Sequence, residues 1–143
     1  MGQQQLLLII LGVIIVGIAI AVSVVMFRDN GVSANRDALR TDLTLLASKA
    51  KIYYRRPVSM GGGGRSFANL TADLSPGGAG MLLLVNREFS DRNANGNYLI
   101  IFSNADSIVF QGIGNILMDD GINRPTVNCS VTASGQPIMT TIH

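Results

Sequence analysis

The stretch LLLIILGVIIVGIAIAVSVVMF, residues 6–27, decides the fold of this chain. Ser23 is its single polar side chain, and the first charged residue of the whole chain is Arg28. A helix of this length spans about 33 Å, which is enough to cross the hydrocarbon core of a bilayer. The rest of a 143-residue chain is too small to bury such a helix on every side. We therefore expect that this helix stays part of the chain and that apolar surroundings from outside the chain cover its faces.

Composition limits what the rest of the chain can be. Hydrophobic residues make up 48% of the sequence and charged residues 14%, which excludes intrinsic disorder. A single cysteine excludes a disulfide-stapled scaffold, a c-type haem site and a cysteine-rich zinc site. A net charge of +2 is too small to indicate nucleic acid as a principal partner.

A helical period continues beyond the apolar segment. Apolar residues recur on one face at spacings of three, four and seven, at Val32, Leu39, Leu43, Leu46, Ala50 and Tyr53. Charged residues occupy the other positions, at Arg36, Asp37, Arg40, Asp42, Lys49 and Lys51. Pro57 ends the pattern, because it lacks an N–H and restricts the residue before it. The sequence predicts one helix over about residues 2–55, within an N-terminal unit 1–56 that divides into a membrane or filament-core part, 1–27, and an amphipathic part, 28–56.

Residues 57–143 are predicted to form a globular β head. The run Gly61–Gly64 lacks the Lys-Ser/Thr of a phosphate loop and indicates a flexible or tightly packed crossover, available for contact with other molecules. Ser66 is placed to cap a short helix. Strand patterns cover residues 98–102, 107–111, 126–133 and 137–142, and turn signals pair them into two hairpins. The predicted class is α+β, with the long helix packed on a four-stranded antiparallel sheet.

Several short motifs have a plain structural alternative. Asp91–Asn97 matches the first half of a calcium loop, but Phe102 stands where a bidentate glutamate is needed, so a turn is the better interpretation. A loop is likewise preferred to a cation site for Asp119-Asp120-Gly121. Two N-x-S/T sequons start at Asn69 and Asn128.

Catalytic chemistry has no support in the sequence. The one histidine, His143, is terminal, and Cys129 lies apart from it on the apolar face of a predicted strand. The sequence therefore predicts no catalytic, cofactor-binding or metal site, and no enzyme.

The orientation of the apolar helix is ambiguous. Basic residues crowd the side after Phe27, which by the positive-inside rule places that side in the cytoplasm. The alternative is that a basic leader once preceded Met1 and held the start of the chain there.

The chain resembles a type IV pilin in its whole architecture. The residues that carry the resemblance are MGQQQLLLIILGVIIVGIAIAV, at 1–22, and KIYYRRPVSMGGGGRSF, at 51–67. The resemblance implies a basic leader, its removal by an inner-membrane prepilin peptidase, and N-methylation of Met1. Such a leader also resolves the question of orientation.

Three departures from the family pattern are evident. Gln5 stands where the family usually has a glutamate that neutralises the ammonium of a neighbouring subunit; an amide oxygen accepts a hydrogen bond but cancels no charge. The apolar segment has no proline, and Cys129 has no partner for the usual C-terminal disulfide. The position of Cys129 on the apolar face of a predicted strand predicts a buried thiol.

The function implied is that of a structural subunit of an extracellular type IV pilus-like filament, held in the inner membrane before assembly. Its partners would be identical subunits and the pilus assembly machinery. The residues implied in assembly are Gln5, Leu6, Leu7, Leu8, Ile9, Ile10, Leu11, Val13, Ile14 and Ile15. Two alternatives stay open: a single-span membrane-anchored binding module, and a minor pseudopilin of a secretion system.

Overall fold

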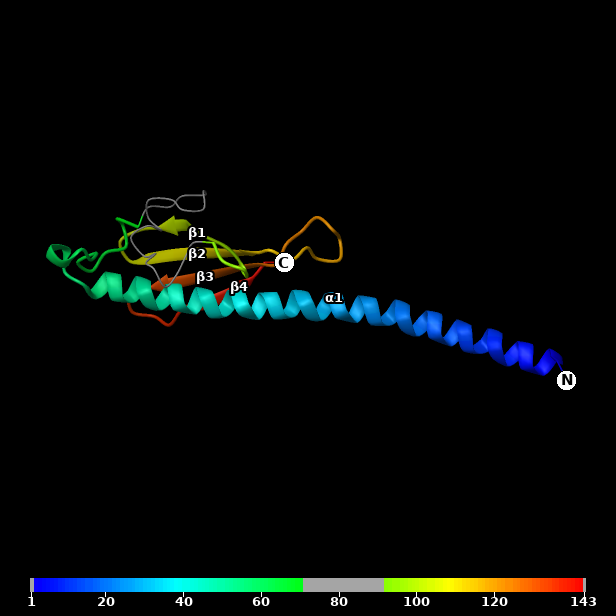
Figure 1. The fold of residues 1–143 in the computed structure, drawn as a ribbon. Coiled ribbons are helices and arrows are strands. Elements are labelled where there is room, and N and C mark those ends of the chain that lie inside the picture. Colours follow the sequence, from blue (N-terminus) through cyan, green and yellow to red (C-terminus); the bar gives the residue numbers. More distant parts are fainter. Residues whose placement is uncertain (1, 71–91, 143) are drawn as a thin grey trace.

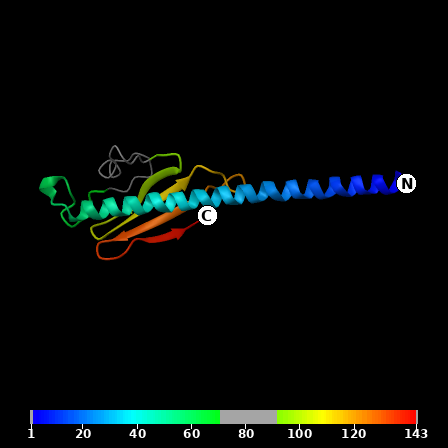
Figure 2. The ribbon, with the colours of Figure 1, turned by 60° about the horizontal axis from the view of Figure 1, so that its bottom comes forward.

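The fold is a long helix laid along one face of a small sheet (Figure 1). The computed structural model describes residues 2–70 and 92–142. Helix α1 (Gly2–Arg55) has 54 residues and is about 80 Å long. Its first half projects away from the head, and its second half lies against the sheet in both views (Figures 1 and 2). The predicted helix and the predicted α+β arrangement are confirmed.

The second half of α1 is amphipathic, and its apolar stripe forms half of the core. The buried residues of the helix are Asn35, Leu39, Leu43, Leu46, Ala47, Ala50 and Tyr53. The predicted stripe is therefore confirmed except at Val32, which is only half-buried because it lies where the helix leaves the sheet. Asn35 and Ala47 join the buried face at helical spacing from Leu39 and Leu43.

The glycine run closes the C-terminal end of α1. After the 3-10 turn η1 (Val58–Met60), the chain folds back, and the N–H of Gly63 donates to the carbonyl of Tyr53 at 2.8 Å. The N–H of Gly64 donates to the carbonyl of Arg56 at 3.0 Å. These bonds satisfy carbonyls that the last helical turn leaves without partners.

The close packing of this run requires glycine. A Cβ atom on Gly63 would lie 2.1 Å from the carbonyl oxygen of Ser66, and one on Gly62 would lie 2.2 Å from that of Arg56. Gly62 and Gly63 are buried, so the prediction that the whole run is open to contact is wrong for these two residues. Their role is to let the backbone cap the helix.

The head contains one antiparallel sheet in the order β1-β2-β3-β4. The strands are β1 (Gly96–Ser103), β2 (Ser107–Gly114), β3 (Thr126–Thr132) and β4 (Ile138–Thr141). All four predicted strands are present, with β1 and β2 longer than predicted. The β1–β2 hairpin turns at residues 104–106, where Asn104 Oδ1 accepts the backbone N–H groups of Asp106 and Ser107.

One face of the sheet packs on α1. Alternate residues of β2 and β3 are fully buried there, at Ile108, Phe110, Val127, Cys129 and Val131. The turn after the glycine run completes the cluster. The ring of Phe67 lies against that of Tyr54 on α1, with the centroids 4.7 Å apart and the planes tilted by 34°. The short helix predicted from Ser66 is wrong for the described part of that segment. Ser66 Oγ instead accepts the N–H of Ala68, and a turn brings Phe67 and Leu70 into the core.

Small residues on the sheet let the helix approach closely at one end. A Cβ atom on Gly114 would lie 2.1 Å from Oδ1 of Asn35, and one on Gly96 would lie 2.9 Å from Cδ2 of Leu39. The helix therefore touches the backbone of β1 and β2 near Asn35, and diverges from the sheet on the N-terminal side of that residue (Figure 1).

Candidate functional site

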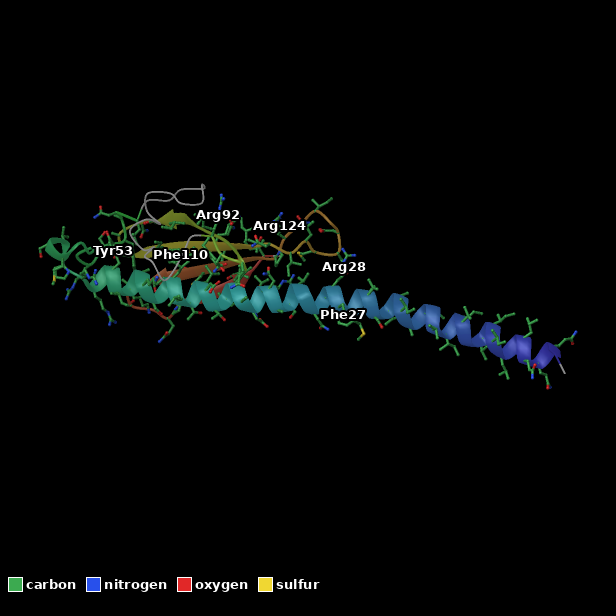
Figure 3. All side chains as sticks on the ribbon, viewed as in Figure 1. Phe27, Arg28, Tyr53, Arg92, Phe110 and Arg124 are labelled. Carbon is green, nitrogen blue, oxygen red and sulfur yellow. The ribbon has the colours of Figure 1, made fainter. Side chains whose placement is uncertain are left out.

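The N-terminal half of α1 presents an extensive exposed apolar surface. Its large apolar side chains between residues 6 and 27 are all at least half exposed, from 50% for Leu11 to 77% for Phe27. Figure 3 shows them projecting from a helix that no other described part of the chain covers. This stretch is long and apolar enough to span a membrane.

The residues implied in assembly all lie on this surface. Gln5 is exposed one residue before the apolar run begins. The nine apolar members of the set have exposed fractions between 50% and 67%. Met1, the predicted processing and methylation site, lies outside the described residues.

The polar groups inside the apolar stretch are satisfied within the helix itself. The backbone is hydrogen-bonded along α1, and the hydroxyl of Ser23 donates to the carbonyl of Ala19 at 2.7 Å. A Cβ atom on Gly12 or Gly17 would touch nothing within 4 Å. The segment can therefore enter lipid, or a bundle of similar helices, without leaving a polar group unpaired.

Charge begins abruptly at the end of the apolar surface. Nε of Arg28 lies 3.8 Å from Oδ1 of Asp119, which belongs to the loop of residues 115–125 between β2 and β3. Both side chains are more than half exposed, so the pair contributes little to stability. The pair marks the end of the head that faces the apolar half of α1, because the loop lies beside the helix at Arg28 (Figure 3).

A carboxylate on the helix fixes the first strand of the head. Oδ2 of Asp42 accepts hydrogen bonds from the side-chain amides of Asn93 and Asn95, both at 2.8 Å. The hydroxyl of Tyr98 donates to the same oxygen at 2.5 Å. Asp42 lies outside the apolar stripe of the helix, yet it is half-buried under these three donors.

These contacts shift two ionisation equilibria in opposite directions. Burial raises the pKa of the Asp42 carboxyl, but hydrogen bonds from Asn95, Tyr98 and Asn93 outweigh it and hold that pKa below its usual value. Burial, together with the nearby carboxylate, raises the pKa of the Tyr98 hydroxyl well above its usual range. At neutral pH the pair is a carboxylate and a neutral phenol.

Asn35 makes a second polar contact one heptad before Asp42. Its Nδ2 donates to the carbonyl of Asn95 at 2.8 Å, and its Oδ1 has no hydrogen-bond partner among the described residues. Asn35 and Asp42 together hold the turn that leads into β1.

The candidate calcium segment is organised as a turn. Oδ1 of Asn93 accepts the backbone N–H groups of Asn95 and Gly96, so this oxygen already has donors. The amide N–H groups of Asn93 and Asn95 point toward Asp42. Asp91 lies outside the described residues.

The second acidic motif is also a turn. Oδ1 of Asp120 accepts the backbone N–H groups of Ile122 and Asn123, and Gly121 has a φ of +67°. This confirms the preference for a loop. Among residues 2–70 and 92–142, no three His, Cys, Asp or Glu side chains are grouped as metal ligands.

The remaining sequence-level candidates have structural roles or cannot be placed. Cys129 is fully buried on the helix-facing side of β3, as predicted, and burial raises the pKa of its thiol to about 11. Asn128 is half-buried and accepts a hydrogen bond from Gln111 at 3.1 Å. Asn69 is exposed, whereas Thr71 of its sequon and His143 lie outside the described residues.

Searches of known protein families, curated proteins and solved structures find no match to this chain. The exposed apolar helix and the attachment of the head to it are therefore the features that bear on function.

Proposed function

We propose that this chain is a structural subunit of an extracellular, type IV pilus-like helical filament, held in the inner membrane before assembly. The single observation that carries the proposal is the apolar surface of residues 6–27, which the described part of the head leaves uncovered. The head and the amphipathic half of α1 form a compact body beyond it. This division of one helix between an uncovered apolar half and a packed half is what a filament with a helical core requires.

The free energy of burying apolar side chains favours a shielded helix, both in the membrane and in a filament. Burying a Leu, Ile or Val side chain is worth roughly 1.5–3 kcal/mol relative to water. Seventeen large apolar side chains of this segment are exposed, so the helix is not stable in water as a lone rod. Transfer from lipid to a bundle of sibling helices gains much less, because lipid tails are already apolar. Extraction from the membrane therefore needs external work, which assembly machinery would supply.

Gln5 and Met1 would meet at the start of neighbouring helices. In this proposal a prepilin peptidase exposes Met1, which is then N-methylated. The side-chain oxygen of Gln5 accepts a hydrogen bond from the ammonium of a neighbouring subunit. An amide costs less to bury than an unpaired carboxylate but neutralises no charge, so the contact is weaker than an ion pair.

Shearing separates a filament subunit from a protein that remains in the membrane. Cells that make the full chain are sheared, the released fibres are sedimented and imaged, and their protein is identified by mass spectrometry. We expect the chain in the fibres. Recovery in the membrane fraction alone would favour the membrane-anchored binding module, and recovery as a trace component of fibres made of another protein would favour the minor pseudopilin.

A variant with matched controls tests the role of the helix. Leu7→Ala, Ile10→Ala and Ile14→Ala in one chain keep the segment apolar and helical but remove side-chain volume from packing between copies. We expect sheared fibres to decrease at least about tenfold, which corresponds to about 1.4 kcal/mol, while the amount in the membrane is unchanged. The control carries Val58→Ala and Ile138→Ala, two exposed apolar residues of the head, and should assemble normally. Equal fibre yields from both chains would contradict the proposal.

A further inference from the structure

The β2–β3 loop, residues 115–125, presents a second apolar surface outside the helix. Ile116, Leu117 and Ile122 are exposed there at 42%, 46% and 81%. The loop leaves the sheet in the direction of the N-terminal half of α1 and extends farther that way than the strands do (Figure 1). It is the part of the described head that lies nearest to the apolar half of the helix.

One contact marks the position of the loop along α1. Asp119, at the tip, lies 3.8 Å from Arg28, the first charged residue after the apolar segment. A helix that crosses a bilayer with residues 6–27 places Arg28 at the boundary between the acyl chains and the headgroups. The loop tip then lies at the same boundary, beside the helix.

The backbone of the loop is suited to that environment. Met118 donates its N–H to the carbonyl of Asn123 at 2.9 Å, and Gly121 donates to the carbonyl of Met118 at 2.9 Å. Asp120 accepts the N–H groups of Ile122 and Asn123. Because these polar groups are paired within the loop, moving it into a less polar layer leaves few of them unsatisfied.

The charges of this region nearly cancel, with a small excess of negative charge. The carboxylates of Asp29, Asp119 and Asp120 stand against the guanidinium groups of Arg28 and Arg124. Such a surface has no strong preference for anionic lipid. Its attraction to a bilayer comes from the exposed apolar side chains, so a zwitterionic membrane is sufficient.

We infer that the β2–β3 loop is an interfacial anchor, whose side chains Leu117 and Ile122 insert among the lipid headgroups beside α1 while the chain resides in the membrane. The occupant of this surface is lipid, because the loop lies beside Arg28, and therefore at the bilayer boundary, within one molecule. The inference rests on the membrane stage of the proposed function and holds whether or not the chain later enters a filament.

Tryptophan fluorescence tests this directly, because the chain contains no tryptophan. The full chain carrying Ile122→Trp is reconstituted into phosphatidylcholine vesicles with lipids brominated near the headgroup end of their acyl chains. Leu117→Trp provides a second reporter in the loop. Ile138→Trp, at an exposed position of β4, is the control on the head. Val16→Trp reports the insertion of the apolar helix.

We expect the loop tryptophans to emit at shorter wavelength than the Ile138→Trp control and to lose at least half of their intensity to the brominated lipid. The control should lose less than a tenth. Quenching of Val16→Trp by bromines deep in the bilayer, with none for the two loop reporters, would overturn the inference and leave the membrane stage intact. If Val16→Trp is also unquenched, the membrane stage fails with it. Loop reporters that are shielded only in sedimented fibres would show that another copy, and not lipid, covers the loop.

Discussion

The hydroxyl of Tyr98 donates a hydrogen bond of 2.5 Å to the carboxylate of Asp42 and so joins the first strand to the long helix across 56 positions of sequence. The amides of Asn93 and Asn95 bind the same oxygen. One carboxylate therefore satisfies three donors at the place where the head is attached. The apolar stripe holds the helix to the sheet, and Asp42 fixes where the start of β1 sits on it.

Removing this carboxylate should destabilise the packing of the head on α1. We expect Asp42→Ala to lower the free energy of unfolding by about 2–3 kcal/mol, because the buried Tyr98 and the half-buried Asn93 and Asn95 lose their acceptor. The measurement is thermal unfolding of the full chain in detergent, followed by the near-ultraviolet circular dichroism of its tyrosines. Asp37→Ala is the control, since that carboxylate is 70% exposed and pairs only with Arg40 on the surface. The control should change stability by less than about 0.5 kcal/mol. Equal effects of the two variants would show that the joint is unimportant.

The hydrogen bonds to Asp42 also predict that the stability of the fold decreases in acid. Hydrogen bonds hold the pKa of Asp42 in the folded protein below its unfolded value of 3.8. The carboxylate therefore stabilises the fold above that value, and this contribution is lost as the pH falls through 3.8 toward the folded pKa. We expect the midpoint of thermal unfolding to fall less steeply between pH 5 and pH 3 in Asp42→Asn than in the unmodified chain. Parallel curves for the two chains would contradict the assignment.

Two Gly→Ala substitutions, one in the glycine cap and one inside α1, should change the free energy of unfolding in opposite directions. Gly63→Ala should lower the free energy of unfolding by at least about 2 kcal/mol, because the new Cβ would overlap the carbonyl of Ser66. Gly31→Ala meets nothing within 4 Å inside helix α1 and should raise stability by up to about 1 kcal/mol. Chemical denaturation in detergent measures both. Destabilisation by Gly31→Ala would mean that the helix needs flexibility at that residue.

Burial of Cys129 predicts a thiol that is protected in the folded head. Iodoacetamide at pH 8 should modify it at least about 100-fold more slowly than a cysteine introduced by Ser134→Cys, because the buried thiol reacts only when the head opens. The pKa of about 11 strengthens the protection, since little thiolate is present at pH 8. Mass spectrometry of the labelled peptides measures both rates in one sample of the variant. Equal rates would place Cys129 at the surface.

Much of the architecture could be predicted from the sequence because its periodicities are strong. The uncharged run to Phe27, the stripe from Leu39 to Tyr53 and the alternation of β3 each indicate one element on one face. The turn at Asn104 was predicted from the polar residues between two apolar runs. These are local signals, and the structure changes only their limits.

What the sequence did not reveal depends on contacts between distant residues. Asp42 has the pattern of a surface charge, and only the arrival of Tyr98 makes it a buried acceptor. The glycine run has the pattern of a flexible or tightly packed crossover, and only its contacts with the carbonyls of Tyr53 and Arg56 show that it is a cap. The seven-residue spacing of Asn35 and Asp42 was the one available signal for a polar joint within the buried stripe.

The central claim is that copies of this chain shield one another's apolar helices outside the cell. Electron cryomicroscopy of sheared surface fibres, with helical reconstruction, tests it most directly. We expect a filament whose core is a bundle of helices formed by residues 6–27, with the sheets arranged around it. Fibres whose core is built by a different protein, or purified chains found only as single molecules with each apolar helix in lipid or detergent, would contradict it.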